Sequence, residues 1–165
     1  MNLKSSIAVF PGSFDPFTRG HIDIVERSLE IFNTVYIAVL DNNSKNCLFS
    51  PEERVALIQE IFRDQKARVI VKSFNGLLVD FVRSVNSRVI IRGLRATSDY
   101  DYEAQMALMN RQLSPEIETL FMMTKEKNSY ISSTLVKSVA PFGGDVKSLV
   151  HPVIEQALKD KYKNK

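Results

Sequence analysis

The chain has 165 residues, of which 44% are hydrophobic and 25% are charged, a composition typical of one globular domain with a single core. The net charge of +3 comes from the last seven residues, 159–165, because the rest of the chain holds 18 basic and 18 acidic side chains. This neutral body argues against a broad nucleic-acid-binding face, and no apolar run reaches the about 18 residues of a membrane span. We expect one domain over 1–158, a basic, disordered tail over 159–165, and a cytoplasmic protein.

Short β-branched runs alternate with segments of helical spacing along the whole chain. The expected strands are 6–10, 34–40, 68–74, 87–93 and 118–123, and the expected helices are 20–32, 51–63, 76–84, 98–112, 132–140 and 151–161. Because the strands are apolar on both faces, the pattern predicts an α/β fold with a doubly wound, five-stranded parallel sheet, Rossmann-like in type.

Two of the expected helices carry further signals. The helix at 51–63 follows Ser50, an N-cap residue, and opens with a proline and two glutamates, which suit the positive end of a helix. In the helix at 98–112 we expect Met106, Met109 and Leu113 to point into the core, although a subunit contact is an alternative.

The loops after the five strands should meet at one edge of the sheet, where ligands bind in folds of this class. They carry glycines, hydroxyl groups and the cationic or imidazole side chains of His21, Lys45, Arg92, Arg95, Lys125 and Lys127. A neutral protein that gathers its cations at one sheet edge is suited to a polyanion. The sequence therefore predicts a phosphate-binding site.

The segment FPGSFDPFTRGH, residues 10–21, follows the first strand. Gly12 allows the backbone to approach a ligand, and Ser13 offers a hydroxyl and an N–H to a phosphate. Asp15 precedes a proline and is expected to hold the turn by accepting local N–H groups. His21 falls at the start of the first helix, where free N–H groups and the helix dipole favour an anion. A plain turn would explain a lone glycine or histidine, but not the whole pattern.

These residues resemble the bacterial phosphopantetheine adenylyltransferases, which belong to a nucleotidyltransferase superfamily marked by the motif (H/T)-x-G-H. The motif stands here as Thr18-Arg-Gly-His21. The resemblance extends almost end to end, and few other adenylyltransferases share its IRGLR segment, residues 91–95. It implies a nucleotidyltransferase fold and adenylyl transfer from ATP to 4′-phosphopantetheine, giving dephospho-coenzyme A and pyrophosphate. It also implies a homohexamer.

The resemblance also implies roles for individual residues. His21 would stabilise the transition state, together with Lys45 and Ser13. The acceptor would be bound by Ser13, Lys45, Leu78 and Arg92. ATP would be bound by Ser13, Phe14, His21, Gly93, Leu94, Arg95, Glu103, Asn128, Ser129, Tyr130, Ile131, Ser132, Ser133 and Thr134. The chain departs from the family pattern at Ser13, where threonine is common, at Asn46-Cys47, and at Asn128, where an aromatic residue is frequent.

The residues themselves support part of this assignment. Arg92 and Arg95 flank a glycine, and two planar guanidiniums can grip two phosphates, while Glu103 can accept hydrogen bonds from a ribose or adenine. Hydroxyls and free N–H groups at 128–134 suit phosphates, although an ordinary N-cap is the alternative. No cluster has metal-ligand spacing, so we expect Mg²⁺ to arrive with the nucleotide.

Three functions remain open at this point. The first is the adenylyl transfer just described. The second keeps that chemistry with another acceptor, nicotinamide mononucleotide or a phosphorylated alcohol. The third is a non-enzymatic module that binds nucleotide or nucleic acid, which the neutral body disfavours. Cys47, the single cysteine, has no histidine near it in sequence and receives no nucleophilic role, and His151 is expected to be a surface residue at a helix start.

Overall fold

The structure is a computed structural model that describes residues 7–41, 46–95 and 97–163. Its centre is a sheet of five parallel strands in the order β3-β2-β1-β4-β5. The strands are β1 (Ile7–Gly12), β2 (Thr34–Leu40), β3 (Val69–Phe74), β4 (Val89–Leu94) and β5 (Glu118–Met123). The strand order reverses at the neighbouring pair β1 and β4, which confirms the predicted doubly wound sheet and marks the crevice where ligands bind in such folds.

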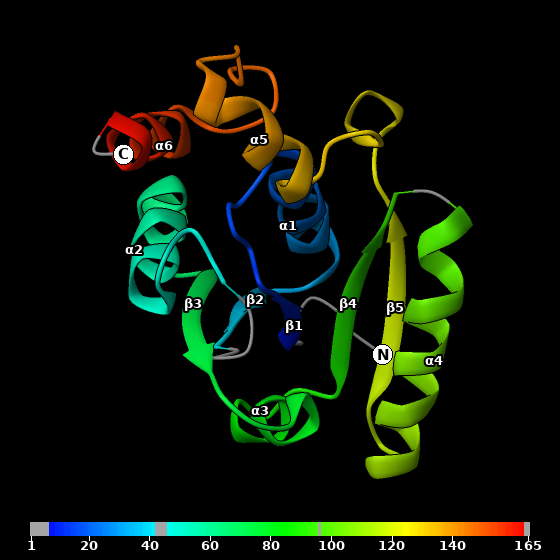
Figure 1. The fold of residues 1–165 in the computed structure, drawn as a ribbon. Coiled ribbons are helices and arrows are strands. Elements are labelled where there is room, and N and C mark those ends of the chain that lie inside the picture. The colour runs from blue at the N-terminus through cyan, green and yellow to red at the C-terminus, as the bar shows by residue number, and fades with distance from the viewer. Residues whose placement is uncertain (1–6, 42–45, 96, 164–165) are drawn as a thin grey trace.

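Helices cover both faces of this sheet (Figure 1). They are α1 (Arg19–Ile31), α2 (Pro51–Ile61), α3 (Leu78–Ser84), α4 (Thr97–Leu113), α5 (Ser133–Val139) and α6 (Pro152–Lys163), with short 3₁₀ turns η2 (Arg63–Gln65), η3 (Glu126–Asn128) and η4 (Ala140–Phe142). None of the helices in the described ranges is long and apolar enough to span a bilayer.

The hydrophobic core lies in two parts, one on each face of the sheet. Along β1, Ala8 and Phe10 join the larger cluster beneath α1, α2, α5 and α6, whereas Val9 joins the smaller cluster beneath α3. Neighbouring side chains of a strand point to opposite faces, so a strand buried on both faces must be apolar at every position. This explains the uninterrupted apolar runs from which the strands were predicted.

Residues 159–163 are helical, which corrects the prediction of a disordered tail. They form the end of α6, whose Leu158 is buried in the larger core. Lys161 places its Nζ 2.8 Å from a carboxylate oxygen of Glu53 and 5.6 Å from the centre of the Phe49 ring. Lys159 pairs with Glu155 on the same helix, so the lysines of this segment belong to an ordered helix, and a basic composition did not indicate disorder here.

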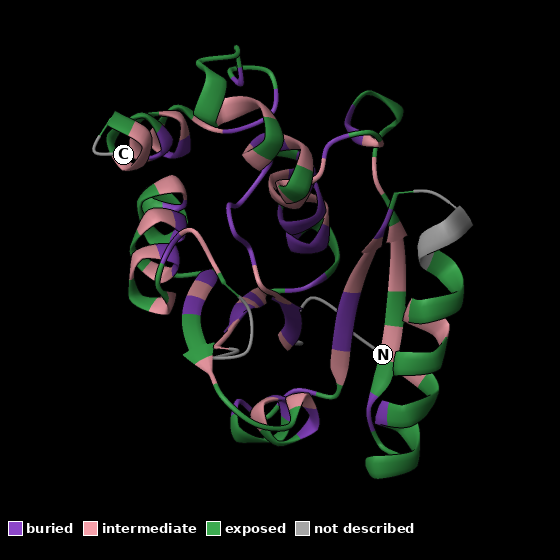
Figure 2. Cartoon of the chain, in the orientation of Figure 1, coloured by how far each residue is buried: buried purple, intermediate pink, exposed green. Residues whose placement is uncertain are grey.

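The apolar side chains of α4 face solvent, and the expectation that Met106, Met109 and Leu113 point into the core is wrong. All three are exposed, as is Leu108 at 67% (Figure 2). The less exposed positions are a stripe of Glu103, Ala104, Ala107 and Asn110 at helical spacing. The helix thus turns small and polar side chains toward the sheet edge and leaves its large apolar ones uncovered in this single chain.

Candidate active site

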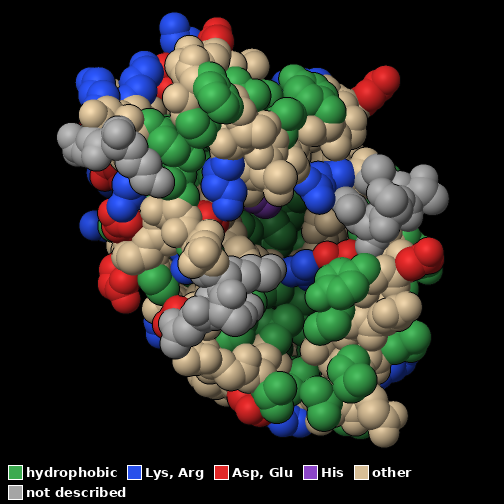
Figure 3. All heavy atoms as spheres, viewed as in Figure 1, with side chains coloured by type: hydrophobic (Ala, Val, Ile, Leu, Met, Phe, Trp, Pro, Cys, Tyr) green, Lys and Arg blue, Asp and Glu red, His purple; other side chains and the backbone are tan. Residues whose placement is uncertain are grey.

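A cavity of about 810 Å³ opens at the carboxyl ends of β1 and β4. Its lining comes from the turn after β1, the start of α1, the end of β4, the helix α4 and the start of α5. Figure 3 shows this hollow near the centre of the face, with Lys and Arg side chains at its rim. The strand ends therefore meet around one space. Of the cations predicted to gather there, Arg92 and Arg95 line the cavity, whereas Lys125 and Lys127 do not.

The turn after β1 is shaped by close packing of aromatic rings. Phe14 has a left-handed backbone, with φ of 51°, and a Cβ on Gly12 would lie only 2.8 Å from two of its ring carbons. The ring centre of His21 lies 5.1 Å from those of both Phe14 and Phe17 and 6.2 Å from that of Phe10. Gly12 thus gives room to a neighbouring ring, and three phenylalanines fix the plane of the imidazole.

His21 is held in one tautomer by the start of α1. Its Nδ1 accepts the backbone N–H of Thr18 at 3.0 Å, in a capping box in which Thr18 is the N-cap. Since an N–H can only donate, Nδ1 carries no proton and the proton of the neutral ring is on Nε2. Burial, and then the charges of Arg95 and Arg92, lower the pKa of His21 to about 3. Near neutral pH the cavity is therefore lined by an uncharged imidazole with one N–H donor.

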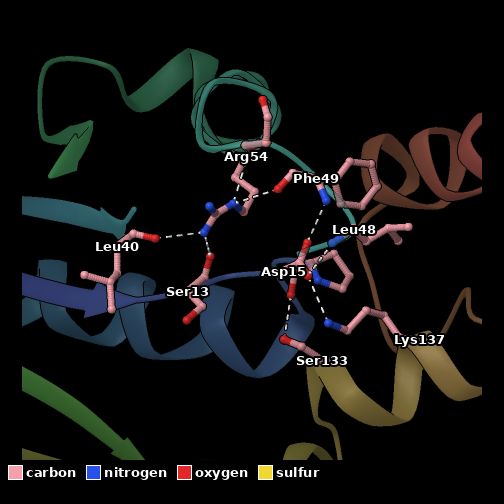
Figure 4. Close-up of polar contacts among 10 residues, drawn as sticks. Ser13, Asp15, Leu40, Leu48, Phe49, Arg54, Ser133 and Lys137 are labelled. Carbon is pink, nitrogen blue, oxygen red and sulfur yellow. Dashed lines mark hydrogen bonds and ion pairs between the residues drawn. The ribbon is translucent and has the colours of Figure 1, made fainter. Parts of the chain in front are cut away.

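Asp15 ties the turn to distant parts of the chain. Its side chain is 4% exposed, and its two oxygens accept the N–H groups of Leu48 and Phe49 at 2.8 and 2.9 Å (Figure 4). It also accepts a hydrogen bond from Lys137 Nζ on α5 at 2.9 Å. Asp15 thus holds the turn, as predicted, but through partners that are far away in sequence rather than local.

Arg92 and Glu103 bind each other. The Nε of Arg92 donates to one oxygen of Glu103 at 2.7 Å, and Nη2 donates to the other at 2.5 Å. Arg92 Nη1 also donates to the carbonyl oxygen of Pro11 at 2.7 Å. A forked ion pair therefore bridges the end of β4, the helix α4 and the end of β1 at the cavity wall.

The start of α5 brings hydroxyl groups to the same cavity. Ser132 is the N-cap of α5 and accepts the N–H of Leu135 at 3.0 Å, so the ordinary capping role is real. The Ser133 hydroxyl donates to the carbonyl oxygen of Pro16 at 2.8 Å. Thr134 is exposed and lines the cavity. One short segment therefore caps a helix and presents side chains to the cavity.

The structure brings most of the predicted site residues together. Those that line the cavity are Ser13, Phe14, His21, Arg92, Gly93, Arg95, Glu103, Ile131, Ser132, Ser133 and Thr134. Five others, all within the described ranges, lie outside this lining: Leu78, Leu94, Asn128, Ser129 and Tyr130. Lys45 lies outside the described residues.

Each of the five has a visible reason for its position. Leu94 ends β4 and its side chain is buried at 7% exposure. Leu78 begins α3 and packs on the smaller core cluster. Tyr130 is 60% exposed, while Asn128 and Ser129 make backbone and side-chain bonds within their own turn, to Lys125 and Glu126.

Sequence reasoning missed Lys137. This lysine lines the cavity from α5 while it pairs with Asp15. Its signal was present, because it lies four residues after Ser133 and so on the same face of the same helix. Cys47 and Tyr102 also line the cavity, and no group of three His, Cys, Asp or Glu side chains in the described part of the chain is arranged to hold a metal ion.

Comparison with known proteins gives consistent matches. A family model described as cytidylyltransferase-like matches residues 9–139. The phosphopantetheine adenylyltransferase of Geobacter metallireducens is 53% identical over 160 residues, which is 97% of this chain and 98% of that protein. The phosphopantetheine adenylyltransferase of Desulfotalea psychrophila is 51% identical over 163 residues, which is 98% of this chain and 96% of that protein.

Solved structures of more distant proteins share the fold. The nicotinic acid mononucleotide adenylyltransferase of Plasmodium falciparum, in complex with NaAD, matches with a TM-score of 0.69 at 16% identity and covers 96% of both chains. A bifunctional NMN adenylyltransferase/ADP ribose pyrophosphatase of Francisella tularensis matches with a TM-score of 0.73 at 17% identity, over 97% of this chain and 51% of that one. These matches agree with the Rossmann-like sheet described above.

Proposed function

The chain belongs to the phosphopantetheine adenylyltransferases, within the cytidylyltransferase-like family, and we propose that it transfers the adenylyl group of ATP to 4′-phosphopantetheine, giving dephospho-coenzyme A and pyrophosphate. The observation that carries this proposal is the identity of about half of all residues to curated enzymes of that name over nearly the full length of both chains. The cavity at the β1–β4 crevice, with its neutral histidine and its arginines, supports it.

The proposed reaction needs no strong base. The acceptor phosphate is an anion at neutral pH and attacks the α-phosphorus of ATP in line, while the bond to pyrophosphate breaks and the electron pair leaves with it. Negative charge is redistributed over the phosphoryl and leaving oxygens, so catalysis consists of positioning and electrostatic stabilisation. In this proposal the Nε2–H of His21 donates to an oxygen of the α-phosphate, and Ser13 and Lys45 hold the attacking phosphate.

The remaining phosphates of ATP would be held by Arg95 and the hydroxyls and N–H groups at 129–134. Arg92 would serve the acceptor and Glu103 the nucleotide. Since these two side chains are already joined in a forked pair, each would act with its partner's charge beside it. Mg²⁺ would arrive with ATP and bind mainly through the phosphates, as this ion does where few carboxylates are offered.

We place the protein in the cytoplasm and propose that it forms a homohexamer. The exposed apolar side chains of α4 and β5 support subunit contacts; they are Tyr100, Tyr102, Met106, Leu108, Met109, Leu113, Leu120 and Met123. Large exposed apolar side chains on two neighbouring elements are typical of a protein–protein interface rather than of a monomer. The hexameric number comes from the family resemblance.

The activity is tested by pyrophosphate release from ATP and Mg²⁺, with and without 4′-phosphopantetheine. We expect release that depends on the acceptor and a product with the mass of dephospho-coenzyme A. Release with nicotinamide mononucleotide or a phosphorylated alcohol instead would assign another acceptor. Retention on DNA at physiological salt without any turnover of ATP would indicate that the protein is a non-enzymatic nucleic-acid-binding module.

A further inference from the structure

Arg54 is a buried arginine that binds main-chain oxygens. It lies on α2, is only 2% exposed, and does not line the cavity. Its Nε donates to the carbonyl oxygens of Phe49 and Ser50 at 3.1 and 3.3 Å. Its Nη1 donates to those of Ser13 and Leu40 at 2.5 and 3.0 Å (Figure 4). One guanidinium therefore joins the turn after β1, the end of β2 and the start of α2.

This arrangement requires the shape of a guanidinium. A rigid planar fork can donate to several oxygens in different directions at once, whereas a lysine ammonium at the same depth is a single point at the end of a flexible chain. A buried charge is costly unless it is hydrogen-bonded, and the four carbonyls accept the N–H groups of Nε and Nη1. The position of each of these carbonyls is thus fixed by the same side chain.

The contact to Ser13 also sets the direction of the next N–H. The Ser13–Phe14 peptide is trans, so its C=O and its N–H point in opposite directions. The C=O points at Arg54, which does not line the cavity, so the N–H of Phe14 points away from Arg54, and Phe14 itself lines the cavity. Within the described ranges that N–H has no hydrogen-bond partner. A main-chain donor beside a cavity is normally paired, here by a ligand if not by the protein.

The charge of Arg54 adds to this effect. A cation hydrogen-bonded to a peptide oxygen withdraws electron density from the peptide and makes its N–H a stronger donor, in the way that chained hydrogen bonds reinforce one another. The left-handed backbone of Phe14, with φ of 51°, is the conformation in which this peptide is held.

We infer that Arg54 is a positioning residue, which orients and polarises the Ser13–Phe14 peptide so that the Phe14 N–H donates to a non-bridging oxygen of the α-phosphate. This rests on the proposed adenylyl transfer. Arg54 touches neither substrate. It acts through one main-chain amide, and it holds that amide against the ends of the loop that joins β2 to α2.

The test compares Arg54→Lys with the wild-type protein and with Arg63→Lys, a conservative change at an exposed arginine. Turnover is measured with ATP and with both diastereomers of ATPαS, in which sulfur replaces one or the other α-oxygen. All measurements are made well below the melting temperature of each protein. We expect kcat with ATP to fall about 10- to 100-fold in Arg54→Lys and to stay unchanged in Arg63→Lys.

The two ATPαS diastereomers distinguish an effect of Arg54 at one α-oxygen from a general effect of Arg54 on the protein. One isomer removes the oxygen that Phe14 would contact, so the same substitution should cost much less with that isomer than with ATP or the other isomer. An equal loss with all three nucleotides would reduce Arg54 to a stabilising residue and overturn the inference. An inactive wild-type protein would instead contradict the proposed function.

A second measurement uses only the wild-type protein, so it tests the inference even if Arg54→Lys does not fold. In the wild-type protein, exchange of the Phe14 amide hydrogen is followed by NMR with and without α,β-methylene-ATP and Mg²⁺. We expect fast exchange in the free protein and at least tenfold slower exchange with the nucleotide. An amide that is already protected without nucleotide, or that does not respond to it, would refute the orientation inferred here.

Discussion

Replacing His21 by asparagine and by glutamine tests the donor at Nε2. The oxygen of an asparagine side chain can take the place of Nδ1, which accepts the Thr18 N–H at 3.0 Å, but asparagine has nothing at the place of Nε2. A glutamine side chain is long enough for its amide NH2 to reach the place of Nε2, and glutamine at this N3 position is also a usual acceptor for the N-cap N–H. Both variants lose the same ring contacts with the neighbouring phenylalanines, so their difference isolates the donor at Nε2.

The expected sizes follow from these contacts. A lost donor to a developing oxyanion costs about 2.7–4 kcal/mol of barrier, so His21→Asn should lower kcat by about 10²–10³ and keep the cap. His21→Gln should lose about tenfold or less in kcat. A lost cap contact costs about 0.5–2 kcal/mol, and because asparagine and glutamine can both offer an oxygen to the Thr18 N–H, the two variants should differ in stability by less than that. At this chain length, each kcal/mol shifts the melting temperature by about 2–4 °C.

Two assays on the same preparations check this: acceptor-dependent pyrophosphate release at saturating substrates, and urea unfolding followed by circular dichroism. The reasoning fails if His21→Asn keeps kcat within threefold of the wild type, because Nε2–H then has no role in the transition state. It fails in another way if His21→Asn is less stable than His21→Gln by more than about 2 kcal/mol, because asparagine then does not retain the contact to Thr18.

The free energy of unfolding should fall as the pH drops from 6.5 toward 3. Over that range the unfolded chain protonates His21, and the folded protein, in which the pKa of His21 is about 3, does not. Urea titrations from pH 4.5 to 7.5 should show a shallower fall in His21→Asn than in the wild type, and parallel curves would contradict the lowered pKa. Asp15→Asn removes one N–H acceptor and the charge that pairs with Lys137, and should lower the free energy of unfolding by about 1.5–3 kcal/mol in urea titrations, whereas the exposed Asp145→Asn should change it little. Leu108→Glu should reduce the mass in sedimentation velocity, while Gln65→Glu, an exposed change of equal charge, should not; an unchanged mass would exclude the α4 face as a subunit contact.

Regular periodicity made the sheet predictable from the sequence. Apolar runs and caps such as Ser50 are local signals, so the strands and the start of α2 lie within two residues of their expected bounds. The site edge followed from topology alone, because parallel strands place their carboxyl ends together. Most of the residues assigned by family resemblance indeed line one cavity.

Contacts between distant segments were not predictable in this way. Asp15 was expected to cap its own turn, but its N–H partners at Leu48 and Phe49 are supplied by the fold. The capping role of His21 escaped notice because that position of a capping box usually holds Glu or Gln. In α4, the spacing of the apolar residues did not indicate that the stripe containing Ala104 and Ala107 would be the one that faces the sheet.

The position of α6 has a consequence for biosynthesis. Ile154 lies beside Phe17, Phe49 and Ile58, next to the turn after β1, and Leu158 is buried in the same cluster. The wall behind a turn near the start of the chain is thus built in part from α6, which is synthesised much later. Because a nascent domain exposes apolar surface until its core is complete, the turn after β1 can complete its packing only once α6 has emerged from the ribosome.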